Sequence, residues 1–74
     1  MTVRREATNK IAIYGRDHGI PHCHAEGRDF RCSISIETQE FIIGAAPPAI
    51  LKSACAWARA HRVELMIKWR ELNQ

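Results

Sequence analysis

The sequence DFRCSISI at residues 29–36 alternates polar and apolar side chains without a break. Phenylalanine, cysteine and two isoleucines fall on one side of an extended chain, and charged or hydroxyl side chains fall on the other. Because successive side chains of a strand point to opposite faces, this alternation predicts a strand with one buried and one polar face. Such strands are typical of antiparallel sheets with one face on a core. The segment therefore predicts an antiparallel sheet that another element must cover.

Two turns on either side of this strand extend it into a meander. Gly27-Arg28 suits a two-residue type II′ turn, with glycine at the position that needs a positive φ. This register joins apolar with apolar and polar with polar residues, which a one-residue slip would prevent. The expected pairs are Glu26–Asp29, Ala25–Phe30, His24–Arg31, Cys23–Cys32 and His22–Ser33. A four-residue loop at 37–40 leads into a short strand at 41–43, with the expected pairs Ile36–Phe41 and Ile34–Ile43.

Two earlier segments complete the expected sheet. Residues 10–14 indicate a short strand, with Ile11 and Ile13 on one face. Residues 1–9 are polar without a clear period, so we expect a frayed arm or a weak edge strand there. The predicted organisation is a polar N-terminal arm over 1–9 and a single α+β domain over 10–74. Its sheet is expected to be an antiparallel meander of three to four strands.

A long C-terminal helix is expected to cover the apolar face of this sheet. Pro47-Pro48 is a typical helix start, and residues 49–72 contain no glycine or proline. Apolar side chains and one histidine recur there at steps of three and four: Ile50, Leu51, Ala54, Ala58, His61, Leu65, Trp69 and Leu72. Such a helix would be about 36 Å long, whereas a strand reaches only about 13–27 Å. It must overhang the sheet or break near His61. An overhanging end predicts a homodimer through this helix or a bound partner, with fraying of the chain end as the alternative.

Size and composition exclude several classes of protein. A chain of 74 residues forms one small domain, which excludes doubly wound nucleotide folds, barrel enzymes and two-domain clamps. The apolar fraction of 46% and the charged fraction of 26% exclude a disordered chain. No apolar run is long enough to span a bilayer or to form a signal peptide, so we expect a cytoplasmic protein without a membrane partner. Its three cysteines form no CxxC pair and are expected to be reduced and buried.

The net charge of +3 lies entirely in the C-terminal part of the chain. Residues 1–46 carry six basic and six acidic side chains, and residues 47–74 carry five basic and two acidic ones. A basic stripe permits contact with phosphate groups or an acidic partner, while a solvated helix face is the simpler interpretation. The candidate binding residues are Arg31, Lys52, Arg59, Arg62 and, at the end of the helix, Trp69.

Three histidines lie within seven residues, in the run DHGIPHCH at 17–24. His22 and His24 are two apart on a predicted strand, so they share a face, and we expect that face to meet solvent opposite the core. Imidazoles at this spacing can chelate Zn²⁺ or another divalent metal, with His18, His22 and His24 as the candidate ligands. Asp17 and Glu26 are alternatives to His18 as the third ligand.

Catalysis without metal is a second interpretation of the same cluster. His22 and His24 could act as a general acid and base on a phosphodiester, while Arg31 holds the phosphoryl oxygens. These three residues are the candidate catalytic residues. Histidines that serve only as polar residues on a sheet surface are the third interpretation. His61 is expected to be a core histidine with a hydrogen-bonded nitrogen.

Several of these residues also resemble the signature of a known family. The run Pro21-His22-Cys23-His24-Ala25 is followed in the helix by Trp57-Ala58, His61-Arg62, Glu64-Leu65 and Trp69. Over roughly residues 10–70 the chain is similar to the small bacterial family catalogued as domain of unknown function 4160. Members often have two prolines before the paired histidines, where this chain has only Pro21. The resemblance implies a partner protein, an RNA or DNA target, and a gene arrangement like that of toxin–antitoxin pairs.

Three functions remain open at this point. The first is an interaction module of a toxin–antitoxin-type or mobile-element system, which binds a partner protein and in some cases nucleic acid. The second is a small ribonuclease-like phosphodiesterase that uses the His18, His22 and His24 patch, with or without metal. The third is a phage- or plasmid-encoded inhibitor that acts by occlusion.

Overall fold

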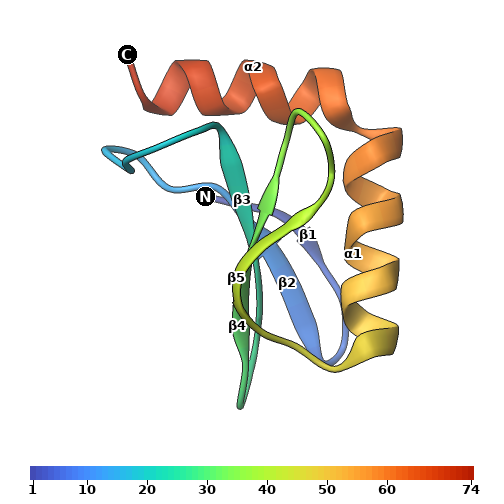
Figure 1. Cartoon of the computed structure of the whole chain (residues 1–74). Helices are drawn as coiled ribbons and strands as arrows, with labels where there is room; N and C mark the ends of the chain where they lie inside the picture. The colour runs from blue at the N-terminus through green and yellow to red at the C-terminus, as the bar shows by residue number, and fades with distance from the viewer.

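The computed structural model describes residues 1–74 as a five-stranded antiparallel sheet followed by two helices (Figure 1). The strands lie in chain order across the sheet, so the predicted meander and the α+β class are confirmed. The expectation of three to four strands is wrong, because there are five. The elements are β1 (Thr2–Arg5), β2 (Asn9–Ala12), β3 (His22–Gly27), β4 (Arg31–Ser35), β5 (Phe41–Ala45), α1 (Pro48–Ala60) and α2 (Arg62–Leu72).

The additional strand is β1, in the polar segment that the sequence left open between a frayed arm and an edge strand. It pairs with β2, and the Ile13 N–H donates a hydrogen bond of 2.8 Å to the Met1 carbonyl. Val3 packs against the core, and the Arg4 guanidinium lies 5.6 Å from the centre of the Trp57 ring. One apolar contact and the ladder hydrogen bonds are therefore enough to order an edge strand without an apolar period.

The predicted register of β3 with β4 is wrong by two residues. The observed pairs are His22–Ser35, Cys23–Ile34, His24–Ser33, Ala25–Cys32 and Glu26–Arg31. The Gly27 N–H donates to the Phe30 carbonyl at 3.0 Å, so the two turn residues are Arg28 and Asp29. A Cβ atom on Gly27 would lie 2.1 Å from the Phe30 ring, which shows that the ring lies over the glycine. A two-residue shift leaves every side chain on its predicted face, so the alternation could not detect the error.

The predicted pairing of β4 with β5 is also wrong. Ile34 lies opposite Phe41, and Ser33 opposite Ile43, with an irregularity between them. The expected pair Ile36–Phe41 does not form, and the Ile36 N–H donates to the Pro21 carbonyl at 3.1 Å. β5 is one of the two edge strands of the sheet, and all five of its residues are exposed.

The prediction of a single long C-terminal helix is wrong, and the alternative of a break near His61 is confirmed. α1 ends at Ala60, α2 begins at Arg62, and His61 between them has φ −117° and ψ 24°. The His61 ring stacks on Trp57 with centroids 4.0 Å apart, and both its backbone N–H and its ring Nδ1 lie within hydrogen-bond distance of the Trp57 carbonyl. His61 is half-buried, with a hydrogen-bonded nitrogen.

α1 runs beside the sheet, and after the break α2 changes direction and lies across the end of the sheet (Figure 1). Leu65 and Trp69 of α2 are therefore buried in the core of their own chain rather than left for another surface. The core is formed by Ile11, Ile13, Cys23, Ala25, Cys32, Ile34, Ile36, Ala54, Ala58, Leu65 and Trp69. All three cysteines are free thiols, and two are buried. Neither helix has the length and apolar character needed to cross a membrane.

Candidate functional site

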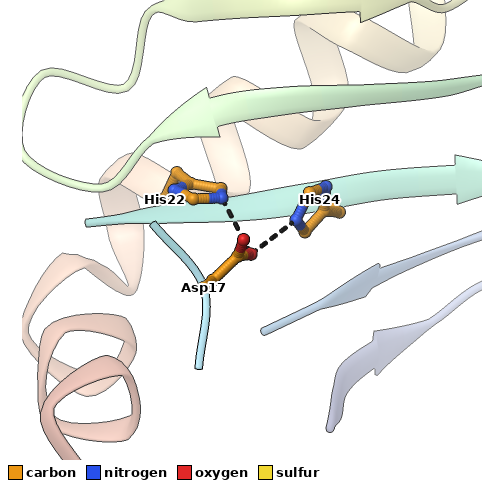
Figure 2. Close-up of side chains that lie close together, drawn as sticks. All are labelled: Asp17, His22 and His24. Carbon is orange, nitrogen blue, oxygen red and sulfur yellow. Dashed lines mark hydrogen bonds and ion pairs between the residues drawn. The ribbon is translucent and has the colours of Figure 1, made fainter. Parts of the chain in front are cut away.

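Three side chains that can bind a cation meet where β3 begins (Figure 2). Asp17 comes from the loop before β3, and His22 and His24 come from the strand itself. The Nε2 atoms of His22 and His24 lie 3.0 and 3.2 Å from the same atom, Oδ2 of Asp17. The ligand atoms of all three side chains lie within 4.8 Å of one another. A carboxylate and two imidazoles thus converge on one point.

The local backbone explains how the loop reaches β3. Arg16 has φ 58° and Gly19 has φ 89°, so the chain turns back at both positions. A left-handed conformation is unfavourable for arginine, and contacts from α2 hold the loop in place. Asn73, just after α2, accepts a hydrogen bond of 2.9 Å from the Asp17 N–H and donates one of 3.2 Å to the Tyr14 carbonyl. The end of α2 therefore positions Asp17.

The expectation that the two imidazoles face solvent is wrong. They lie on the strand face opposite Cys23, as predicted, yet only 8% of His22 and 7% of His24 is exposed. The Trp69 ring lies 5.0 Å from the His22 ring, and the Tyr14 ring lies 5.3 Å from the His24 ring. α2 and the loop before β3 cover this end of the sheet, which the sequence assigned to a bare surface (Figure 1). The site is an enclosed cluster rather than an open patch.

The hydrogen bonds of His22 determine which of its ring nitrogens carries a hydrogen. Its Nδ1 lies 2.7 Å from the Ile20 carbonyl oxygen, which can only accept, so Nδ1 carries a hydrogen. In a neutral ring, Nε2 then directs a lone pair at Oδ2 of Asp17. The oxygen of an ionised carboxylate can also only accept a hydrogen bond, so the two atoms would repel each other. A proton on Nε2 resolves this contact, and so does a metal cation placed between the two atoms. A positive charge between Nε2 of His22 and Oδ2 of Asp17, carried by a proton or by a metal ion, would therefore stabilise this contact.

His24 is held by a partner with more freedom. Its Nδ1 lies 3.3 Å from the hydroxyl oxygen of Ser33, the residue opposite it on β4. A hydroxyl can donate or accept, so His24 can adopt either neutral tautomer. Either a hydrogen or a free lone pair can thus be presented by Nε2 to Asp17.

The Asp17 carboxylate is kept ionised by its neighbours. Burial alone would raise the pKa of this carboxyl. The hydrogen bond from His24, the attraction of His22 and the hydrogen bond from the His18 backbone N–H outweigh burial and lower the pKa below its ordinary value. The cluster therefore offers a carboxylate, rather than a carboxylic acid, at neutral pH.

The structure does not bring every predicted site residue into this cluster. His18 is exposed, and only its backbone N–H contacts the cluster, at 3.2 Å from Oδ1 of Asp17. Arg31 pairs with Glu26 at 3.0 Å and lies 5.7 Å from the centre of the Tyr14 ring. Tyr14 donates its hydroxyl hydrogen to Glu26. Glu26, the other alternative for the third ligand, is thus already engaged outside the cluster.

The candidate binding residues of the helices are divided between the surface and the core. Lys52, Arg59 and Arg62 are exposed, and the Arg62 side chain donates to the Glu37 carbonyl at 3.2 Å. Trp69 is buried against His22 and the core, where it packs within the chain. The positions of the three basic residues permit contact with an acidic surface, whereas the Trp69 ring is enclosed.

Sequence reasoning missed Tyr14 as a neighbour of the histidines, and it paired Ser33 with His22 instead of His24. Ser33 would have followed from the correct register, which places it opposite His24. Alternation in the predicted strand at 10–14 puts Tyr14 on the face opposite Ile11 and Ile13, which is the face of the histidines, and this signal could have identified it.

Comparison with known proteins identifies the chain by its sequence family. No curated protein and no solved structure matches it. The sequence model of the domain of unknown function DUF4160 matches residues 10–70, which include Asp17, both histidines of the cluster and most of α2. This match covers more than half of the chain, so the chain belongs to the DUF4160 family.

Proposed function

We propose that this chain is a small cytoplasmic interaction module that binds a partner protein through the outer edge of β5, in a toxin–antitoxin-type pair. The observation that carries the proposal is a run of exposed apolar residues on this edge strand. Phe41, Ile42 and Ile43 are 45%, 41% and 68% exposed. A contiguous exposed apolar segment of this kind marks an interaction surface.

The backbone of β5 supports the same interpretation. β5 pairs with β4 on one side only, and none of its backbone groups takes part in the other hydrogen bonds of the fold. Natural edge strands are commonly protected by charged residues, proline or a covering element. The β5 sequence, FIIGA, has no charged residue or proline. At the opposite edge, β1 carries Arg4 and Arg5. The two edges thus differ in the way expected if β5 is the one that pairs.

The occupant that fits this edge is an extended segment of a partner protein. A strand added to β5 would satisfy its free N–H and C=O groups, and alternate side chains would contact the exposed isoleucines and Phe41. The exposed Lys52, Arg59 and Arg62 permit an additional contact with nucleic acid or with an acidic surface of the partner. An inhibitor that acts by occlusion would engage its target through the same edge.

A phosphodiesterase is less well supported by the geometry. General acid–base catalysis requires imidazole nitrogens that can reach a substrate, but Nε2 of both histidines contacts Asp17. The guanidinium of Arg31 pairs with Glu26. A nuclease would therefore have to break these contacts before it could bind a phosphodiester.

Two equally exposed residues provide a matched test of the β5 edge. Ile43 on β5 is 68% exposed and Val63 on α2 is 69% exposed, so lysine should be tolerated at both. The partner protein to be used is the product of the neighbouring gene, co-purified with the chain and titrated by calorimetry. We expect Ile43→Lys to weaken binding at least tenfold and Val63→Lys to leave it unchanged.

The opposite pattern would overturn the proposal. Loss of binding in Val63→Lys alone would place the interface on α2, where the homodimer through the C-terminal helix was predicted. Sedimentation of each variant without the partner tests that homodimer. Equal binding by both variants and the wild type would exclude both surfaces.

A further inference from the structure

We propose that Asp17, His22 and His24 form a binding site for one divalent transition-metal ion of the Zn²⁺ class. The ligand atoms would be Nε2 of each imidazole and a carboxylate oxygen of Asp17 (Figure 2). The site is separate from β5, so this inference does not depend on the proposed partner interface.

The distances between the three side chains suit such an ion. Zn²⁺ binds imidazole nitrogen and carboxylate oxygen at about 2.0–2.2 Å, which puts tetrahedral ligand atoms about 3.4 Å apart. The two Nε2 atoms lie 3.0 and 3.2 Å from Oδ2 of Asp17. The carboxylate would therefore have to move away from each imidazole by a few tenths of an ångström. All the ligand atoms lie within 4.8 Å of one another, so the two imidazoles would also have to adjust until their nitrogens reach the same spacing of about 3.4 Å.

The outer contacts of both histidines are those of metal ligands. A metal-binding histidine usually donates its second ring N–H to a carbonyl, carboxylate or hydroxyl, which fixes the ring and leaves the other nitrogen unprotonated. His22 makes this contact with the Ile20 carbonyl at 2.7 Å, and His24 can make it with the Ser33 hydroxyl at 3.3 Å. Both Nε2 lone pairs then point at the carboxylate. A cation at this position satisfies all three groups at once.

The ligand set selects the class of ion. Mg²⁺ and Ca²⁺ prefer oxygen ligands, and a site with two imidazoles and one carboxylate suits first-row transition ions instead. Three protein ligands also leave at least one coordination position free. About 30% of the Asp17 side chain is exposed, and it borders a small surface cavity shared with Arg16, His18, Leu72, Asn73 and Gln74.

The other two histidines of the chain serve as matched controls. His18 is next to Asp17 in sequence but exposed, and His61 lies at the helix break with its Nδ1 against Trp57. The experiment titrates protein purified without a histidine tag with ZnCl₂ by calorimetry, and counts bound metal by elemental analysis. We expect one Zn²⁺ per chain. We also expect at least about 100-fold weaker binding in His24→Gln and Asp17→Asn, because the loss of a ligand should cost at least as much as the loss of an outer contact.

The controls should behave differently from the ligand variants. His18→Gln and His61→Gln should bind Zn²⁺ as the wild type does, and Ser33→Ala should weaken binding about tenfold because it removes the outer contact of His24. Nitrogen-15 NMR of the wild-type histidine rings provides a measurement that no folding defect can obscure. Zn²⁺ should shift Nε2 of His22 and His24 and leave His18 and His61 unchanged.

The outcomes that contradict the site are also distinct. Absence of stoichiometric Zn²⁺ binding by the wild type would exclude it. An equal loss of affinity in His18→Gln and His24→Gln would show that His18 is also a ligand, and would contradict the proposed set of three. Partner binding by Ile43→Lys is measured separately, so failure of the metal site and failure of the proposed function can be told apart.

Discussion

The His22 ring lies against the Trp69 ring, with centroids 5.0 Å apart and planes inclined by 49°. This contact joins the first residue of β3 to the last turn of α2. Trp69 also belongs to the hydrophobic core, so one side chain lines both the core and the Asp17–His22–His24 cluster. The geometry of the cluster therefore depends on the docking of α2 across the end of the sheet.

Replacement of Trp69 should disturb stability and the cluster together. Trp69→Ala should lower the free energy of unfolding by about 3–5 kcal/mol, because it removes a buried aromatic ring and leaves a cavity. Trp69→Phe should cost less, because it keeps a ring beside His22. Trp57→Ala, at a half-buried position on α1, is the control and should cost less than Trp69→Ala. Urea denaturation measures all three, and equal costs for the two alanine variants would contradict the assigned role of Trp69.

The position of α2 gives a second prediction. Leu65 is fully buried against the sheet, whereas Val63, two residues earlier, is 69% exposed. Leu65→Ala should therefore cost about 2–5 kcal/mol of unfolding free energy, and Val63→Ala should change it by no more than about 0.5 kcal/mol. Thermal or urea unfolding of the two variants measures the difference. A small effect of Leu65→Ala would mean that α2 does not pack on its own chain as described.

The faces of the strands could be predicted from the sequence, but their register could not. Alternation assigned Cys23, Cys32 and Ile34 to the core, and all three are buried. The same alternation is satisfied when β3 slides two residues along β4, so it contains no information on that choice. The Phe30 ring over Gly27 accompanies the observed register, and this contact exists only in the folded hairpin.

The break between the helices and the third member of the cluster depend on tertiary contacts. Residues 49–72 contain no helix-breaking residue, and the observed break is accompanied by the stacking of His61 on Trp57 and the burial of Leu65. Asp17 and His18 are adjacent, and the turn at Arg16 together with the Asn73 hydrogen bond directs the aspartate inward. Spacing in the sequence could therefore place the two strand histidines together, but could not choose between their loop neighbours.

Gly44 gives a third prediction, based on a close approach of two backbones. It has φ 104°, and a Cβ atom there would lie 2.3 Å from the Arg31 carbonyl oxygen. Gly19 has φ 89° but open space around its Cα atom, so it separates backbone strain from collision. Gly19→Ala should cost about 1–2 kcal/mol of unfolding free energy, and Gly44→Ala about 3 kcal/mol or more. Equal costs in chemical denaturation would show that β5 can move away from β4 at this point.

The buried thiol of Cys23 gives a prediction for alkaline pH. Burial, followed by the proximity of Cys55 and Cys32, raises the pKa of Cys23 from 9.0 to about 12. The folded chain therefore keeps this proton at a pH where the unfolded chain loses it. The resulting stability is fully present below pH 9 and is lost as the pH rises from 9 towards 12, at about 1.4 kcal/mol for each pH unit. The total loss is about 4 kcal/mol over that range.

A comparison of variants isolates this effect from other groups that titrate at high pH. The pKa of Tyr14 is also raised, chiefly by its hydrogen bond to Glu26, and burial raises the pKa of Cys32 and of Cys55. Tyr14→Phe, Cys32→Ala and Cys55→Ala are therefore needed beside Cys23→Ala. Cys23→Ala should start less stable at pH 7, because it leaves a cavity, but should lose less stability between pH 9 and 11 than the wild type. Urea denaturation at pH 7, 9, 10 and 11 gives the slopes. Parallel slopes for Cys23→Ala and the wild type would show that solvent reaches this thiol, and that β3 is not sealed against the helices at its centre.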